Sequence, residues 1–142
     1  MGTSSSIKKV NFEDIQLIIK NHKQCLLINT LDRTEQDCLI SKTIPITMEE
    51  RIINTYMKKN KEIEIIIYDK NANTSNIMKK YDQLLGLGFI NVYIYPGGLF
   101  EWLLMQDIYG FENFPTTKKE LDILKFKSKS IFINNYSLKN IV

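Results

Sequence analysis

The residues best suited to chemistry form a polar turn near the middle of the chain. Its seven positions are Asp69, Lys70, Asn71, Ala72, Asn73, Thr74 and Ser75. The apolar run at 63–67 before it is typical of a strand buried on both faces of a parallel sheet. Apolar residues recur at helical spacing over 77–85 after it. Backbone N–H groups in a turn between a strand and a helix N-terminus hold anions, so we predict an anion site here.

Two cysteines and one histidine are the other candidate reactive side chains. Cys25 begins an apolar segment and Cys38 lies in a separate loop, without the spacing of a metal site. Cysteines that no neighbour assists are usually inert, so we expect neither to act as a nucleophile. We interpret His22 as a surface residue rather than a general base, because no acid or thiol is spaced to orient it. The sequence therefore predicts no metal site and no cofactor.

The segments around the turn alternate between strand and helix patterns. We expect strands at 25–31, 43–46, 63–67 and 89–95, and helices at 11–22, 47–57, 77–85 and 99–110. Asn11 is the expected cap of the first helix. The helix at 99–110 is apolar on most sides, which predicts deep burial or a partner surface. Alternating strands and helices indicate an α/β fold, a small mostly parallel sheet with helices on both faces.

Three motifs along this arrangement resemble those of the rhodanese family. The turn reads Tyr-Asp-x-x-Ala-x-Thr-Ser from Tyr68 to Ser75, where the family has Tyr-Cys-x-x-Gly-x-Arg-Ser. Further on, the stretch from Gly88 to Val92 matches the family's Gly-Phe/Tyr-x-x-Val. The stretch from Gly97 to Trp102 matches its Gly-Gly-x-x-x-Trp. The resemblance implies a three-layer rhodanese-like fold.

The match fails at the nucleophile, because Asp69 stands where the family has its cysteine. The family's turn lowers the pKa of the cysteine thiol and stabilises a persulfide, and a carboxylate cannot form that bond. We expect Asp69 to accept the turn's own N–H groups and so fill the anion site from within. Ala72 and Thr74 replace the family's Gly and Arg, which removes close backbone approach and positive charge. The resemblance therefore implies an inactive sulfurtransferase site.

Two functions of different classes fit these observations. In the first, the chain is a non-catalytic binding or scaffolding module for an unknown protein partner. The partner would bind at the turn or at the surface near Phe100, Tyr109 and Phe111. In the second, Asp69 accepts a phosphoryl group as part of an enzyme, although no acidic pair for Mg²⁺ is visible. Residual sulfurtransferase activity through another thiol is a further alternative. We favour the first because the family's sulfur is missing.

Composition indicates one globular domain. The chain has 142 residues, of which 44% are hydrophobic and 25% charged, with a formal net charge of +3. Its basic residues are mostly lysines mixed with acids, a pattern that argues against nucleic acid as a partner. A run of about 18 apolar residues, as a membrane span needs, is lacking, so we expect a cytoplasmic protein. The abundance of Ile, Asn and Lys suggests an AT-rich genome, such as that of a protist or a large DNA virus.

The first residues carry a candidate lipidation signal. The segment from Met1 to Ser6 fits the N-myristoylation pattern Met-Gly-x-x-x-Ser/Thr, and Lys8 and Lys9 follow it. A single myristoyl chain binds membranes weakly and reversibly, so a lipid on Gly2 would give peripheral attachment that needs a partner or a basic patch. A flexible serine-rich start is the alternative reading.

These patterns divide the chain into three parts. Residues 1–9 form a flexible N-terminal segment, 10–114 a rhodanese-like domain and 115–142 a C-terminal extension. Within the extension we expect a short helix at 118–124 and an edge strand at 125–130, with 130–133 paired beside it. The sequence also leaves open that the extension is a disordered or partner-binding arm.

Overall fold

A small parallel sheet forms the centre of the protein. The computed structural model describes residues 6–135, and the predicted lipidation site at Gly2 lies outside that range. The strands lie in the order β1, β2, β3. Their bounds are Cys25–Asn29 for β1, Glu64–Tyr68 for β2 and Val92–Ile94 for β3. All of them pair in parallel, so their carboxyl ends meet at one edge, which we call the carboxyl edge.

Single bridges widen the sheet on both sides. Thr43 pairs in parallel beside Leu27 of β1, and the N–H of Ile44 donates to the Leu27 carbonyl at 2.8 Å. On the other side, Lys9 pairs in parallel beside Ile94 of β3. The short strand expected at 43–46 is therefore present as a single bridge, and the N-terminal segment adds an unexpected one.

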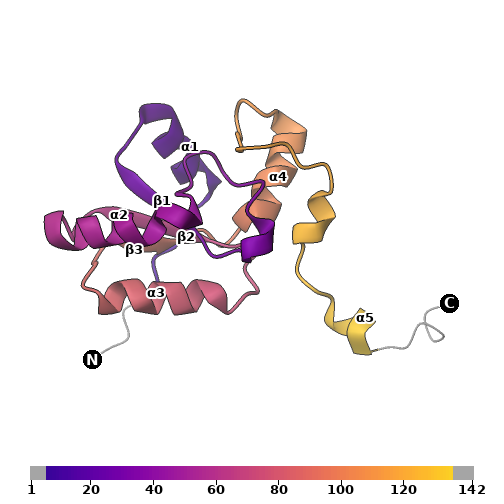
Figure 1. The fold of residues 1–142 in the computed structure, drawn as a ribbon. Coiled ribbons are helices and arrows are strands. Elements are labelled where there is room, and N and C mark those ends of the chain that lie inside the picture. The colour runs from indigo at the N-terminus through magenta and orange to yellow at the C-terminus, as the bar shows by residue number, and fades with distance from the viewer. Residues whose placement is uncertain (1–5, 136–142) are drawn as a thin grey trace.

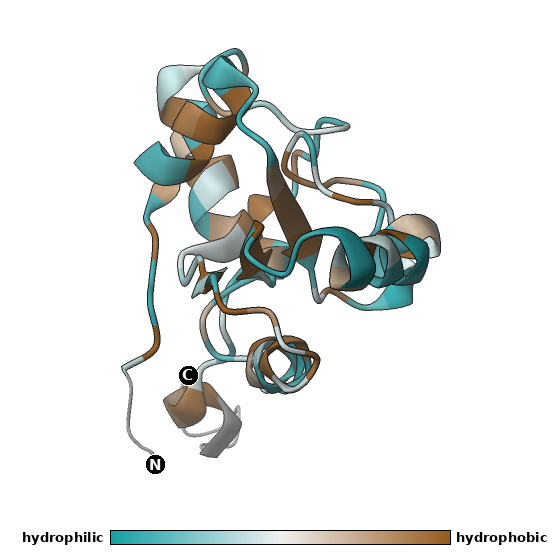
Figure 2. Cartoon of the chain, turned by 90° about the vertical axis from the view of Figure 1, so that its left-hand side faces the viewer, coloured by the Kyte–Doolittle hydropathy of each residue, from teal (hydrophilic) through white to brown (hydrophobic). Residues whose placement is uncertain are grey.

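Helices cover both faces of the sheet (Figure 1). The bounds are Phe12–Asn21 for α1, Ile46–Lys59 for α2, Asn76–Gly86 for α3 and Gly98–Tyr109 for α4. Leu27, Ile66 and Tyr68 face a core shared with α1 and α4. Ile65 and Ile67 face a second core shared with α2 and α3. The predicted three-layer fold is confirmed, and the hydrophobic strands lie between the helices in Figure 2.

The first helix has the N-terminal cap that the sequence predicts at Asn11. The Asn11 side chain accepts the N–H groups of Glu13 at 2.9 Å and Asp14 at 3.2 Å, and Asp14 accepts the N–H of Asn11 at 3.0 Å. This reciprocal capping box satisfies backbone donors that the first turn leaves unpaired. His22 ends the helix in a left-handed conformation, with φ of +51°.

Helix α4 has one buried side and one exposed side. Leu99, Trp102 and Leu103 are at most 1% exposed, so one side of the helix is core. Leu104 and Ile108 are 38% and 67% exposed, so the other side faces outward. The apolar character on most sides therefore reflects deep burial of one face together with an uncovered outer face.

The C-terminal extension differs from its prediction. It contains a 3₁₀ helix, η2 (Ile123–Phe126), and a short helix, α5 (Ile131–Asn135), so the expected helix at 118–124 and the expected strands at 125–133 are wrong. The reason is Phe126, which is 2% exposed in the core beside α4. Its carbonyl accepts a hydrogen bond from the Asn71 side chain, so the backbone there bonds to a side chain rather than to a neighbouring strand.

Among residues 6–135, no helix has the length and apolar character to cross a membrane.

Candidate functional site

Asp69 follows β2 directly and lies at the carboxyl edge of the sheet. Its side chain is buried, with the residue 2% exposed. One carboxylate oxygen, Oδ1, accepts the N–H of Lys70 at 2.6 Å, and the other, Oδ2, accepts the hydroxyl of Thr30 at 2.6 Å. Both oxygens are therefore engaged inside the protein. The expectation that Asp69 accepts N–H groups of its own turn holds for one donor, and Thr30 at the end of β1 supplies the second.

The amino end of α4 holds the backbone of the same turn. The N–H of Leu99 donates to the Asp69 carbonyl and the N–H of Phe100 to the Lys70 carbonyl, both at 2.9 Å. Gly98 makes this approach possible, because it has φ of +65° and a Cβ there would stand 2.5 Å from the Asp69 carbonyl oxygen. Only glycine adopts this backbone conformation without strain and leaves that space. Gly98 therefore allows the start of α4 to hold the turn.

The remaining turn residues bond mainly to one another and to the extension. The Asn71 side chain accepts the N–H of Asn73 at 2.8 Å and donates to the Phe126 carbonyl at 2.9 Å. Ala72, Asn73 and Ser75 are exposed. The Thr74 hydroxyl is buried and has no hydrogen-bond partner in the described part of the chain. Two N–H donors of the turn, those of Lys70 and Asn73, are thus occupied by the turn's own side chains.

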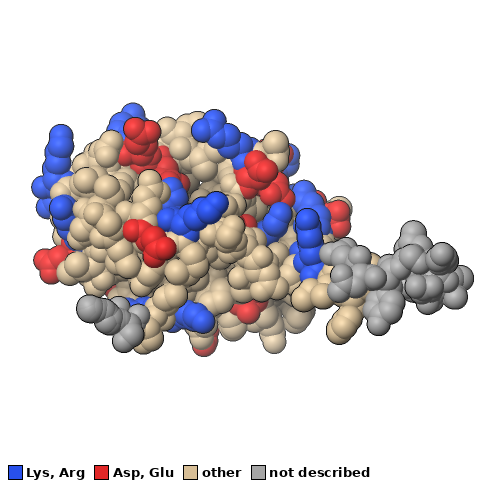
Figure 3. Space-filling model, turned by 90° about the horizontal axis from the view of Figure 1, so that it is seen from below, with Lys and Arg blue, Asp and Glu red and all other residues tan. Residues whose placement is uncertain are grey.

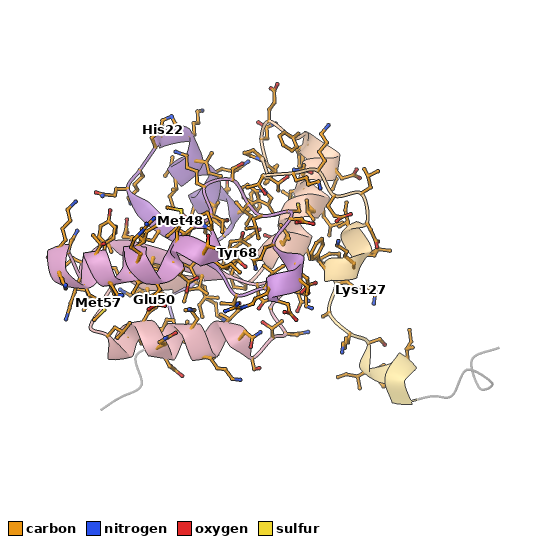
Figure 4. All side chains as sticks on the ribbon, viewed as in Figure 1. His22, Met48, Glu50, Met57, Tyr68 and Lys127 are labelled. Atoms are coloured by element: carbon orange, nitrogen blue, oxygen red, sulfur yellow. The ribbon has the colours of Figure 1, made fainter. Side chains whose placement is uncertain are left out.

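Tyr68, the last residue of β2, directly precedes the turn and is held in the core. It is fully buried near the centre of the molecule (Figure 4). Its hydroxyl accepts the N–H of Ile40 at 3.1 Å and lies 2.7 Å from the Thr43 hydroxyl. Burial raises the pKa of Tyr68 well above its usual range, so the phenol stays neutral. Tyr68 is therefore a positioning residue of the core.

Neither cysteine reaches the turn. Cys25 begins β1 at the opposite edge of the sheet, and burial, together with Glu64, raises the pKa of its thiol to about 12. Cys38 is 5% exposed, its Sγ lies 3.1 Å from the Lys118 carbonyl oxygen, and burial raises its pKa. A raised pKa keeps both side chains as thiols, the less nucleophilic form.

The sequence predicts a candidate partner surface at Phe100, Tyr109 and Phe111. In the structure these residues lie at different places, because Phe100 is near the start of α4, Tyr109 is its last residue and Phe111 follows it. Phe100 packs against the core beside the turn. Tyr109 ends the helix, about 14 Å further along at 1.5 Å per residue. Tyr109 and Phe111 are 59% and 36% exposed. The turn and the outer end of α4 are therefore separate surfaces.

The structure also forms a groove that the sequence did not indicate. It lies between α2 and α3, has a volume of about 750 Å³, and Thr30, the hydrogen-bond partner of Asp69, is among its lining residues. Its polar lining includes Arg33, Glu50, Asn54, Lys79 and Gln83. An ion pair between Lys80 and Glu49 joins the two helices. Strand β2 separates the two helices in the sequence, so no local pattern indicates that their polar sides lie next to each other.

Comparisons with known proteins agree with this geometry. The family model for the rhodanese-like domain matches residues 21–105. A search of curated proteins found no match. Three similar solved structures illustrate the fold. The BH2092 protein of Bacillus halodurans is 18% identical, with a TM-score of 0.59, and the match covers 84% of this chain and 90% of that one.

The other two structures come from yeast. The single-domain sulfurtransferase RDL2 of Saccharomyces cerevisiae is 19% identical, with a TM-score of 0.57 and coverage of 76% and 98%. The protein tyrosine phosphatase Ygr203w, described as a rhodanese-family member, is 11% identical, with a TM-score of 0.58 and coverage of 84% and 98%. Identities this low show the fold alone.

The fold and the position of the turn define a rhodanese-like α/β domain. Since the family model spans more than half of the sequence, the chain belongs to the rhodanese-like domain family.

Proposed function

We propose that this protein is a non-catalytic member of the rhodanese-like family that acts as a binding module. The observation that carries the proposal is the state of Asp69, a buried carboxylate whose two oxygens accept hydrogen bonds from Thr30 and from the turn. Sulfur transfer requires a sulfur nucleophile at this place, and a carboxylate cannot carry a persulfide. A negative charge that already accepts the Lys70 N–H and the Thr30 hydroxyl also repels an anionic substrate.

The charges at the carboxyl edge support the same conclusion. Residues 30–37, 69–75 and 95–98 follow the three strands, and together they hold four acids, Asp32, Glu35, Asp37 and Asp69. Two basic residues, Arg33 and Lys70, accompany them. The net charge of these three segments is two bases minus four acids, or −2, which disfavours anions such as thiosulfate.

A phosphate-handling role for Asp69 has weaker support. The similar yeast structure is named as a protein tyrosine phosphatase, but the likeness extends to the fold alone. An aspartate nucleophile needs a free oxygen and a nearby cation, whereas both oxygens of Asp69 accept hydrogen bonds. Within residues 6–135, no group of three His, Cys, Asp or Glu side chains could hold a metal ion. We therefore favour the binding role.

The groove between α2 and α3 is the surface we assign to a protein partner. Its volume of about 750 Å³ lies in the range of known ligand pockets, and its lining mixes charged and amide side chains. Apolar side chains such as Ile53, Leu84 and Leu87 line it as well, so the groove fits an amphipathic segment of a partner protein. Gly2 acylation, as the sequence predicts, would add peripheral attachment to a membrane.

The catalytic half of the proposal is tested with thiosulfate and cyanide. The purified protein should yield no thiocyanate above the uncatalysed reaction. Turnover would overturn the proposal, and turnover that disappears in Cys38→Ser or Cys25→Ser would identify the thiol responsible.

The binding half is tested by comparing captured proteins. Asn54→Arg and Gln83→Arg place bulky charge in the groove, and Asn21→Arg at the exposed end of α1 is the control with the same charge change. A partner that the wild type and the control retain, and both groove variants lose, supports the assignment. Equal capture by all four proteins would refute the groove as the binding surface.

A further inference from the structure

The side of the sheet where the three parallel strands begin, which we call the amino edge, lies opposite the Asp69 turn and carries a concentrated positive charge. Four connecting segments meet at this amino edge, namely 20–25, 41–43, 58–64 and 86–92. They contain six lysines, all exposed: Lys20, Lys23, Lys42, Lys58, Lys59 and Lys61. The acids among them are Glu62 and Glu64. Six bases minus two acids gives +4, in contrast to −2 at the carboxyl edge.

Direct contacts join these segments into one surface. The Gln24 side chain donates to the Tyr56 hydroxyl at 2.7 Å, which links the start of β1 to the end of α2. The Asn91 side chain donates to the Glu62 carbonyl at 2.7 Å, which links the loops before β2 and β3. Lys42 Nζ lies 2.8 Å from His22 Nδ1, which brings in the fourth segment.

The figures show the same edge from several sides. It lies at the left of Figure 1, where α2 ends, and Figure 4 labels His22 and Met57 there. Basic side chains project from this end in Figure 3. The lysines therefore share one end of the molecule although the sequence scatters them.

Favourable interaction with the negative ends of helix dipoles accounts for only some of these lysines. Lys20, Lys58 and Lys59 lie in the last turns of α1 and α2, where a positive charge stabilises the helix end. Lys42 and Lys61 lie outside any helix. Lys23 also lies outside, and it forms an ion pair with Glu64 at 2.6 Å. The excess charge is thus available to an external anionic partner.

We propose that the amino edge is a docking surface for an anionic lipid membrane. Ile90, which is 60% exposed, lies beside the lysines, and its N–H donates to the Lys61 carbonyl at 3.4 Å. An uncovered apolar side chain among lysines suits the boundary between lipid headgroups and acyl chains. The four segments contain no arginine, and their aromatic residue, Phe89, is 1% exposed. The neighbouring Tyr56 ring is half-buried and has Lys59 Nζ 5.8 Å from its centre, so little aromatic face is left on which bases could stack.

The path of the N-terminal segment supports this choice of partner. Lys9 pairs in parallel with Ile94 of β3, so the described residues before Lys9 lie on the amino side of that bridge. Lys8 Nζ stands over the Tyr93 ring at 5.8 Å, which places another lysine on this route. The described residues 6–8 therefore run along β3 towards the lysine edge. This inference goes beyond the proposed binding role and does not require an inactive site.

Vesicle sedimentation of the unacylated protein tests the proposal without depending on Gly2. Phosphatidylcholine vesicles with and without phosphatidylserine are compared for three proteins. The edge variant is Lys58→Gln/Lys59→Gln/Lys61→Gln. The control variant is Lys118→Gln/Lys119→Gln/Lys127→Gln, which removes the same charge from the C-terminal extension. Thermal melting checks that both variants fold.

We expect the wild type to bind only the phosphatidylserine vesicles, with affinity that falls as salt rises. The edge variant should bind about 100-fold more weakly, since each lysine near an anionic membrane contributes about fivefold. The control variant should bind like the wild type. Equal loss in both variants, or no binding of the wild type to anionic vesicles, would overturn the proposal. Release of the wild type from the vesicles by duplex DNA at equal anionic charge would also overturn it and assign the edge to nucleic acid.

Discussion

Replacing Gly98 with alanine should destabilise the protein through the turn that carries Asp69. Gly98 has φ of +65°, and a Cβ there would stand 2.5 Å from the Asp69 carbonyl oxygen and 2.9 Å from the Lys70 carbonyl carbon. A left-handed conformation costs an alanine about 1–2 kcal/mol. Relieving the clash displaces the two hydrogen bonds from Leu99 and Phe100 to the turn, which contribute about 1 kcal/mol each. We therefore expect a loss of about 3–4 kcal/mol in the free energy of unfolding.

Urea denaturation measures this loss, and Gly86 provides a matched control. Gly86 is the last residue of α3, and a Cβ there meets nothing within 4 Å. Gly86→Ala should therefore leave stability unchanged or raise it by up to about 1 kcal/mol, because alanine favours the helix. If Gly98→Ala unfolds at the same urea concentration as Gly86→Ala, the amino end of α4 does not hold the turn and the positioning argument is refuted.

Three further variants extend the test. Asp69→Ala should lower the free energy of unfolding by about 2–4 kcal/mol, because it leaves the Lys70 N–H unpaired and leaves the Thr30 hydroxyl only its longer bond to the Tyr68 carbonyl at 3.4 Å; a neutral result in urea denaturation would show that these bonds do not matter. Phe126→Ala should cost about 3–5 kcal/mol in the same assay, since the side chain is buried, and an unchanged midpoint would mean that the extension is not part of the fold. The raised pKa of Cys25 predicts that the folded state keeps a proton that the unfolded state loses above pH 9, so stability should fall from pH 9 towards 12 and fall less steeply in Cys25→Ala; equal slopes would contradict the assignment.

The sequence predicts the layers of the fold well because its strongest signals are periodic. The short apolar run before Asp69 is enriched in β-branched residues and the stripe at 77–85 has helical spacing, and they appear as β2 and α3. The capping pattern at Asn11 is local, and the structure reproduces it in full. The segment 125–130 alternates as a strand does, but a strand also needs a partner, and the burial of Phe126 determines its structure instead.

The candidate site is only partly readable from the sequence, because its contacts are distant along the chain. The position of Asp69 at a strand end followed from its neighbours alone. Its bond to Thr30 crosses 39 residues, and the bond from Asn71 to Phe126 crosses 55. The groove between α2 and α3 and the lysine edge likewise depend on how the βαβ units pack. Periodicity carries no information about such pairings.

The occupation of the anion site by Asp69 is tested most directly by anion binding. Melting temperature is measured with increasing thiosulfate for the wild type, Asp69→Ala and the surface control Asp82→Ala. We predict that thiosulfate raises the melting temperature of Asp69→Ala, since the variant frees the Lys70 N–H and the Thr30 hydroxyl, and leaves the wild type and the control unaffected. A wild type that thiosulfate stabilises as strongly as Asp69→Ala would contradict the account.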